Sequence, residues 1–353
     1  MGVGIRRPRP RAAQGARPRV GVAVRSGGMF DDAIDEFWDW WDGVRDELAT
    51  AIDDESPTDI PDELTDKVWR IHPDLDWQLA PGSGARHSLN LVSGGTRLLR
   101  LVSELWRRKG PEADETWEYH PARVPFPPES FLVSGVEIDP TDATVSLTPD
   151  DTYRRLDTTI AHPAFADLSD DDAREVALYL LDATLGEDDA ERWIGILQPT
   201  AEPQGTALAD VAATVDRLVD GWDGDGWEDV SDQYDGVVEA RVDRSLKWID
   251  HLDKPIYAEI TIASLANDTE GFPADLELNR LESLTRDLLA RLGDGAVLAG
   301  TATGDGERSI HLFMRNDPDL NAVVETWVEV NPNRSIDTEF APDEQWSYAE
   351  QWD

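Results

Sequence analysis

The sequence of 353 residues contains no cysteine and little lysine. Without cysteine the chain forms no disulfide, binds no metal through thiolates and has no cysteine nucleophile. Lysine occurs four times against 28 arginines, while aspartate and glutamate together number 73. No apolar run approaches the roughly 18 residues that a transmembrane helix needs. We therefore expect a protein that does not engage membranes.

The charge that is present is overwhelmingly acidic, with a net value of −41 at pH 7. Repulsion on this scale strains a compact fold at physiological salt, where the Debye length is roughly 8 Å; in molar salt it shrinks to roughly 3 Å. Scarce lysine and abundant aspartate thus predict an acidic surface and the cytoplasm of a salt-accumulating halophile. A body of this charge repels a phosphate backbone, so we expect no nucleic-acid partner.

The first 28 residues have the opposite character. They hold seven arginines and no acidic residue, so the remainder of the chain carries −48. The segment lacks the apolar core of a secretory signal, and its Ala, Gly, Pro and Arg bias resembles translated upstream DNA. We interpret 1–28 as a disordered basic segment and expect Met29 to be the natural start, with a targeting or nucleic-acid-binding arm as the alternative.

The rest of the chain is rich enough in apolar residues, at 40% with 14 tryptophans, to bury sizeable cores. Its length predicts two or three modules. We expect N-terminal helices plus an α/β module over 29–128, a middle α/β module over 129–220, an acidic Gly/Trp linker over 221–236 and a C-terminal domain over 237–353. The predicted fold class is α+β, with mixed α/β modules.

In the first module, Phe30, Ile34, Phe37, Trp41, Val44 and Leu48 recur at helical spacing. We interpret this stripe as the buried face of an amphipathic helix, not as a membrane or partner-binding helix. A second helix is expected from Pro61 to about Arg70. Two strands (76–79 and 88–92), a helix around Leu98–Leu105 and a strand (117–124) follow.

The middle module is expected to contain strands at 131–136, 144–147, 156–160 and 193–197. Ser169 is a predicted helix N-cap, with the helix ending near Gly186. Apolar residues recur at helical spacing over 208–219, which predicts a further helix.

The C-terminal module has the clearest pattern. Alternation over 256–262 predicts a half-buried strand, and leucines at helical spacing after Pro273 predict a helix that stops at Gly293. Strands at 297–301 and 309–314 flank a Gly304–Gly306 turn. A helix at 320–328 and a strand at 334–340 complete a β-α-β-β-α-β order, which predicts a ferredoxin-like domain. A short closing helix is expected at 346–352.

An acidic loop invites a calcium interpretation, because hard cations bind several carboxylates on a flexible loop. Its acidic residues are Asp220, Asp223, Asp225, Glu228 and Asp229. The spacing fails the EF-hand pattern, since Trp227 takes a ligand position and Glu228 stands where the central glycine belongs. We prefer a solvated linker.

Other chemical motifs are absent. The six histidines form no HExxH or His-x-His pattern; they are His72, His87, His120, His162, His251 and His311. Ser83 and Ser93 lie among glycines but outside a GxSxG elbow, so we interpret both as turn residues. Gly300, Gly304 and Gly306 match neither GxGxxG nor a Walker loop. We therefore name no catalytic, cofactor-binding or metal-ligating residue, and no cofactor.

Three segments resemble proteins of the domain of unknown function 695 family. Residues 88–124, SLNLVSGGTRLLRLVSELWRRKGPEADETWEYHPARV, are similar to its strand, helix, Pro-containing turn and Trp-containing strand. Residues 180–197, LLDATLGEDDAERWIGIL, also resemble that group, and the segment from Ile256 to Trp346 is similar to its namesake domain in element order. The resemblance implies no activity and no catalytic residues.

Two functional hypotheses follow. The first is a non-catalytic protein-binding or regulatory module whose sheet faces or acidic surface meet a protein partner. The second is a hydrolase that uses carboxylate and histidine chemistry in an inter-domain cleft. A buried cleft with a strongly shifted carboxylate beside a histidine favours the hydrolase, whereas a large exposed apolar patch favours partner binding. The oligomeric state is not determined by the sequence.

Overall fold

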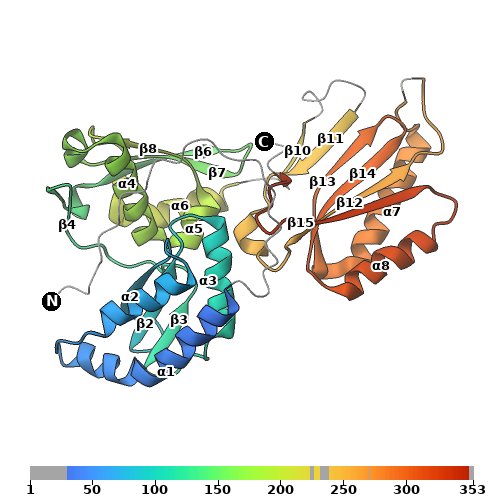
Figure 1. The fold of residues 1–353 in the computed structure, drawn as a ribbon. Helices are drawn as coiled ribbons and strands as arrows, with labels where there is room; N and C mark the ends of the chain where they lie inside the picture. Colours follow the sequence, from blue (N-terminus) through green and yellow to red (C-terminus); the bar gives the residue numbers. More distant parts are fainter. Residues whose placement is uncertain (1–29, 223–225, 231–237, 270, 350–353) are drawn as a thin grey trace. The chain divides into compact units, whose positions relative to one another are not determined.

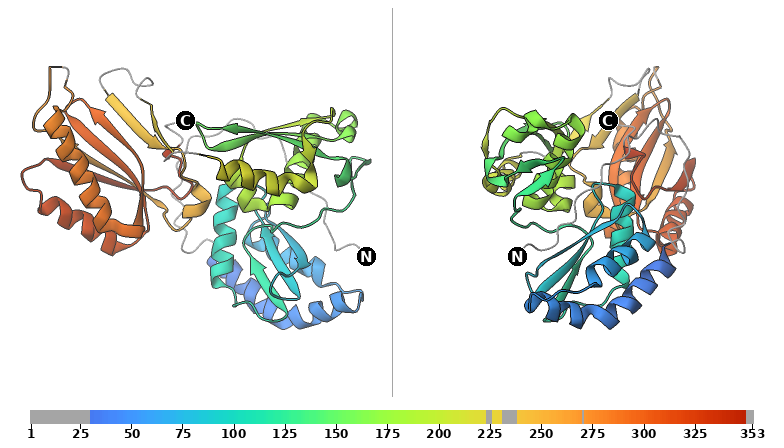
Figure 2. Two further views of the ribbon diagram at one scale, coloured as in Figure 1. Left: turned by 180° about the vertical axis from the view of Figure 1, so that it is seen from behind. Right: turned by 60° about the vertical axis from the view of Figure 1, so that its left-hand side comes forward.

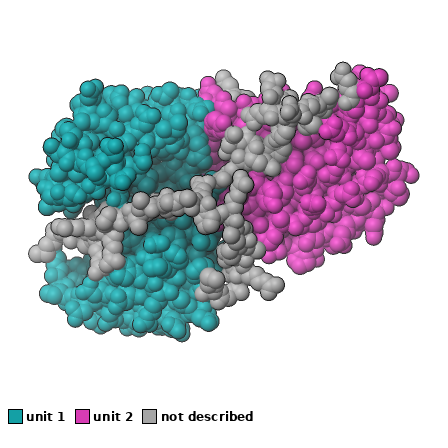
Figure 3. Space-filling view, turned by 45° about the horizontal axis from the view of Figure 1, so that its top comes forward, with its two compact units in different colours: residues 1–150, 155–221 teal, residues 151–154, 222–353 magenta. Residues whose placement is uncertain are grey.

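A computed structural model describes residues 30–222, 226–230, 238–269 and 271–349. The chain folds into two compact units, coloured separately in Figure 3: residues 1–150 with 155–221, and residues 151–154 with 222–353. The described part is a mixture of α and β structure with eight α-helices, as the sequence predicts. None of these helices is long and apolar enough to cross a membrane.

The first half of unit 1 packs three helices with a three-stranded sheet (Figure 1). The sheet order is β1-β2-β3, with β1 and β2 antiparallel and β2 and β3 parallel. The elements are α1 (Asp31–Asp53), α2 (Ile60–Ile71), β1 (Asp76–Pro81), β2 (His87–Val92), α3 (Arg97–Lys109) and β3 (Trp117–His120). The predicted order of helices and strands is therefore confirmed for this half.

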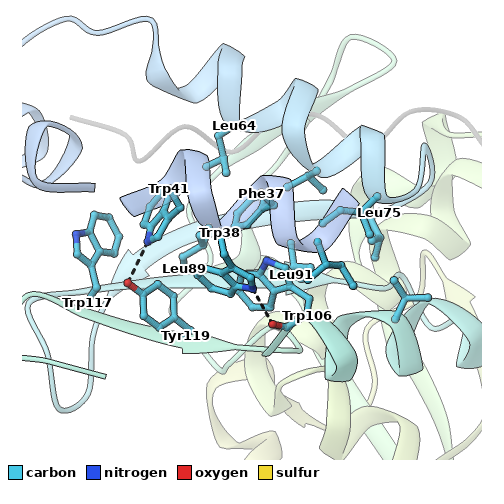
Figure 4. Close-up of a cluster of buried hydrophobic side chains, with 14 of the residues drawn as sticks. Phe37, Trp38, Trp41, Leu64, Leu75, Leu89, Leu91, Trp106, Trp117 and Tyr119 are labelled. Carbon is cyan, nitrogen blue, oxygen red and sulfur yellow. Dashed lines mark hydrogen bonds between the residues drawn. The ribbon is translucent and has the colours of Figure 1, made fainter. Parts of the chain in front are cut away.

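Aromatic side chains form much of the core of this half (Figure 4). The rings of Trp38 and Trp106 stack with centroids 4.6 Å apart, and Trp38 Nε1 donates to the carbonyl of Trp106. Trp41 Nε1 donates to the hydroxyl of Tyr119 at 3.0 Å. The indole N–H groups of Trp38 and Trp41 are thus satisfied inside the core, and the interpretation of α1 as a core-packing helix is confirmed.

The second half of unit 1 contains a four-stranded sheet of order β8-β7-β6-β9 and a small hairpin, β4-β5. Its strands are β4 (Phe131–Val133), β5 (Val136–Ile138), β6 (Thr144–Asp150), β7 (Arg155–Ala161), β8 (Ile194–Thr200) and β9 (Thr206–Ala207). Its helices are α4 (Asp170–Leu185), α5 (Glu187–Trp193) and α6 (Val211–Asp220). Ser169 caps α4 as predicted, because its side chain accepts from the N–H of Asp172.

Unit 2 is built on a six-stranded sheet of order β10-β11-β13-β14-β12-β15, antiparallel throughout. Helices α7 (Asp275–Leu292) and α8 (Pro318–Glu329) cover one face (Figure 2). The strands are β10 (Trp227–Asp229), β11 (Val238–Asp243), β12 (Ile256–Ala263), β13 (Ala296–Gly304), β14 (Glu307–Met314) and β15 (Ile336–Pro342). Asp305 and Gly306 both have positive φ in the β13–β14 turn, as a two-residue I′ hairpin requires.

The structure contains α5, β9 and β11, which the sequence analysis did not predict, and it also differs from the prediction in the following segments. The strand expected at 131–136 is a hairpin, because Ser134 and Gly135 turn the chain with positive φ. The strand expected at 117–124 ends at His120. Residues 227–229, inside the expected linker, form β10; residues 223–225 and 231–237 lie outside the described residues. No α-helix occurs over 346–349, and 350–352 lie outside the described residues.

Candidate functional site

The acidic loop that invited a calcium interpretation is only partly described. Glu228 pairs with Arg244 at 2.9 Å, and Asp229 lies 3.7 Å from Arg241. Among the residues that the structure describes, no group of three histidines or acidic residues is arranged to hold a metal ion. Glu228 and Asp229 of this loop are therefore engaged with arginines in the β10–β11 region.

The six histidines are dispersed over both units and do not converge. Each histidine has its own partners. The ring nitrogens lie within hydrogen-bonding or ion-pair distance of these residues: His72 of Asp74, His87 of Asp53, His120 of Glu118, His162 of Asp139 and Ala164, and His311 of Tyr257. The ring of His251 stacks on Trp346.

Ser83 and Ser93 are both turn residues that hold a buried carboxylate, which supports the interpretation from sequence. The N–H and hydroxyl of Ser83 donate to Glu118 Oε1 at 2.8 and 3.1 Å. Burial raises the pKa of Glu118, but the backbone donors of Ser83 and Gly84 and the His120 ring outweigh it and hold the pKa at about 2. Glu118 is thus an ionised structural anchor for the β1–β2 turn.

Ser93 belongs to the most elaborate polar cluster, which we call the Glu187 cluster: Ser93, Gly95, Arg123, Asp182 and Glu187. The Glu187 carboxylate is buried and accepts from Ser93 Oγ at 2.5 Å, from Ser93 N at 3.0 Å, and from the N–H groups of Gly95 and Arg123 at 3.2 Å. Its own N–H donates to the carbonyl of Arg123. The start of α5 is therefore fastened to the turn after β2 and the segment after β3.

Local backbone geometry makes these hydrogen bonds to Glu187 possible. Gly94 and Gly95 have φ of 58° and 70°, so the chain after β2 turns the N–H groups of Ser93 and Gly95 toward one carboxylate. Gly186 has φ of 82°, and a Cβ there would lie 3.0 Å from Pro125 Cδ. A glycine at 186 thus allows α4 to end and α5 to begin against the segment after β3.

Asp182, near the C-terminal end of α4, has an unusual environment in this cluster. Its side chain is 7% exposed, and its Oδ2 lies 3.9 Å from Arg123 Nη1. Burial and the nearby charge of Glu187 raise the pKa of Asp182 to about 7, although Arg123 opposes the shift. With a pKa of about 7, the Asp182 carboxyl is about half protonated at neutral pH.

Unit 2 holds a second buried polar pair on the sheet face opposite α7 and α8. The Tyr257 hydroxyl and His311 Nδ1 are 2.7 Å apart, and both residues are buried. Burial lowers the pKa of His311, although Glu259, its cross-strand neighbour, opposes the shift. Tyr348 stacks on Tyr257 with centroids 4.2 Å apart, so the segment after β15 covers part of this face.

A hollow of about 500 Å³ opens in unit 2 between α7, the segment after β12 and the segment after α8. We call it the α7–α8 hollow; it is lined by Leu265, Arg280, Ser283, Leu284, Asp287, Val330, Asn331, Pro332, Asn333 and Arg334. Leu265 is 60% exposed and Val330 55% exposed. Sequence reasoning did not identify this site, because its lining residues come from three separate segments.

The charged groups at the α7–α8 hollow are largely engaged. Arg334 forms an ion pair with Glu277, whose side chain is 1% exposed, and this guanidinium lowers the pKa of Glu277. Asp287 accepts from Trp327 Nε1 at 3.0 Å and from Arg291 at 3.0 Å. Arg280 Nη1 lies 3.7 Å from Glu277 Oε2, and the Arg280 side chain is 67% exposed. The hollow therefore combines exposed apolar groups with an accessible cation.

Comparison with known proteins gives one match. Residues 226–351 match the family described as "Family of unknown function (DUF695)". No curated protein and no solved structure matches the chain. The resemblance predicted over 88–124 and 180–197 lies outside the matched residues and stays a prediction. The matched segment contains the whole six-stranded sheet, the Tyr257–His311 pair and the α7–α8 hollow, and the predicted resemblance to the domain of unknown function 695 family is confirmed for this part of the chain.

Proposed function

We propose that this protein is a non-catalytic protein-binding or regulatory module. The observation that carries the proposal is the α7–α8 hollow, where Leu265 and Val330 are more than half exposed at the rim of a concave site. Exposing such side chains to water is unfavourable by roughly 25 cal/mol per Å² of apolar surface. Apolar surface at a concave site is the usual mark of a surface that a partner covers.

Proton-transfer catalysis in the α7–α8 hollow has less support than partner binding. Neither a histidine nor a hydroxyl beside a general base occurs among its lining residues, and Arg334 keeps the neighbouring Glu277 ionised. Ser283, the hydroxyl that lines the hollow, donates to the carbonyl of Asn279. A catalytic base needs a pKa near the working pH and reach to its substrate.

The test is capture of a stoichiometric partner at multimolar salt by the wild type and by two variants. Leu265→Ser removes an apolar group from the hollow, whereas Leu276→Ser removes an equally apolar group that is 76% exposed on α7 and does not line the hollow. We expect the wild type and Leu276→Ser to retain the partner and Leu265→Ser to lose it. Equal retention by both variants would contradict the proposal.

We also infer that unit 2 is a ferredoxin-like domain with two added strands. Support comes from the chain order β12-α7-β13-β14-α8-β15 and from the antiparallel sheet order β13-β14-β12-β15, which interleaves two split β-α-β units. Strands β10 and β11 extend the sheet beyond β13. The net charge of −41 supports an acidic, salt-adapted surface and the cytoplasm of a halophile as the working environment.

The second candidate, a hydrolase, has one supporting observation. Asp182 has a pKa of about 7, which suits a general acid or base. Its neighbours offer little else for hydrolysis, since the Ser93 hydroxyl already donates to Glu187 and the described contacts of Asp182 include no histidine. Absence of turnover on ester, amide and phosphate substrates, or turnover that Asp182→Asn leaves unchanged, would remove this candidate.

A further inference from the structure

Strand β15 forms one edge of the six-stranded sheet in unit 2 (Figure 2). It pairs with β12 on one side over its whole length of seven residues. Five of its residues, Asp337–Phe340 and Pro342, are exposed. An edge of this kind offers unpaired backbone groups to an incoming strand.

The hydrogen bonds that flank β15 show which of its backbone groups point outward. Ala263 N donates to Ser335 O, and Asp343 N donates to Pro255 O. In an antiparallel ladder, hydrogen-bonded and non-hydrogen-bonded pairs alternate. Residues 335, 337, 339, 341 and 343 therefore point their backbone groups toward β12. Residues 336, 338 and 340 point theirs to the free edge.

The outward groups form a regular template. The N–H groups of Ile336, Thr338 and Phe340 recur at every second residue and, by this alternation, face away from β12, the one described strand that pairs with β15. Pro342, which has no N–H, closes the series. Phe340 is 39% exposed, so an added strand would also cover apolar surface. The edge has the spacing that strand addition requires.

The side chains of this edge select against a second copy of the chain. In the register, Glu339 lies directly opposite Glu259 on β12, and Asp337 lies on the same face of the sheet as Glu339. Antiparallel pairing of two β15 edges about Thr338 would place Asp337 opposite Glu339 of the other copy. Like charges directly opposite are destabilising, whereas opposite charges stabilise a strand pair.

We propose that β15 is a docking edge for an extended, cationic segment of a protein partner, in which basic residues alternate with apolar ones. The basic side chains would face Asp337 and Glu339, and the apolar side chains would cover Ile336 and Phe340. The inference rests on the proposed protein-binding function and assigns it a second surface, separate from the α7–α8 hollow.

The experiment uses a capped seven-residue peptide of alternating valine and arginine as the probe, titrated against the full chain by calorimetry. Thr338→Pro removes the central outward N–H while leaving the hydrogen bonds to β12, since proline is tolerated at edge positions of this kind. We expect this variant to bind at least tenfold more weakly. Asp337→Asn with Glu339→Gln should weaken binding about tenfold at low salt, because it removes two cross-strand charge pairs.

A matched control separates the edge from the general acidity of the protein. Glu325→Gln with Glu329→Gln removes two exposed charges from α8 in the same unit and should bind the probe like the wild type. If the two double variants weaken binding of the probe equally, the attraction is non-specific and the proposal is overturned. A folded Thr338→Pro variant that binds the probe with wild-type affinity would also overturn it.

Two readouts do not depend on the folding of any variant. A probe N-methylated at alternate amides, which cannot pair with a strand edge, should not bind. Amide hydrogen exchange should slow at Ile336, Thr338 and Phe340 when the unmodified probe is added; unchanged exchange there would refute the edge site. If the edge variants keep the native partner while Leu265→Ser loses it, the proposed function stands and the edge inference fails.

Discussion

Replacing Asp182 by Asn should stabilise the protein at alkaline pH, although the change removes a native charge. The side chain is buried beside Glu187, and burial and that charge raise its pKa from 3.8 to about 7. Ionising Asp182 in the folded state therefore puts a second buried negative charge beside a carboxylate that already accepts four hydrogen bonds. Asn has nearly the same shape and avoids that charge.

The size of the stability change, and the pH range over which it occurs, follow from the linkage between proton binding and folding. A pKa about three units higher in the folded state means that the folded protein binds more protons than the unfolded chain between about pH 4 and pH 7. Stability falls across that window as pH rises, and levels off above it. At about 1.4 kcal/mol per unit, the loss attributable to Asp182 reaches roughly 4 kcal/mol at pH 8.

Urea unfolding of wild type and Asp182→Asn at pH 4.5, 6, 7 and 8, in constant molar KCl, measures this difference. We expect the stability of the variant relative to wild type to rise by roughly 3 kcal/mol from pH 4.5 to pH 8, because part of the loss has already occurred at pH 4.5. Asp171→Asn, at an exposed site in the first turn of α4, is the control and should show a much smaller pH-dependent difference. A difference for Asp182→Asn that stays constant with pH would refute the reasoning.

Three further predictions concern packing, ion pairing and salt. Gly110→Ala should destabilise by about 1–3 kcal/mol in chemical denaturation, because a Cβ there would lie 2.3 Å from the Trp38 ring; an unchanged midpoint would contradict the packing described. Arg334→Met should cost about 3 kcal/mol, since it leaves the buried Glu277 carboxylate with only the exposed Arg280, at 3.7 Å, as a cation, and a thermal melt showing no loss would exclude that role. Raising KCl from about 0.1 to 2 M should raise the melting temperature by screening the net charge of −41; a fall would count against salt adaptation.

Much of the secondary structure is readable from local patterns. Helix α1 follows from apolar residues at helical spacing, and α4 begins at Ser169 and ends before Gly186 as predicted. The β13–β14 turn follows from its glycines. The hairpin at Ser134 and Gly135 also carries a local signal, a Ser-Gly pair between the short strand segments Phe-Leu-Val and Val-Glu-Ile, which the prediction of one strand overlooked.

The acidic composition, the absence of cysteine and the positions of most helices and strands are therefore properties that the sequence determines by itself, because each depends on residue content or on neighbours within a few positions. The polar sites depend on contacts across the fold. Ser93 meets Glu187 across 94 positions, and only burial beside that carboxylate raises the pKa of Asp182. The free edge of β15 likewise exists because sheet order leaves it without a second neighbour among the described strands. Which carboxylates are buried and which strand lies at an edge are decided by tertiary packing, since periodicity records which face is apolar but not what covers it.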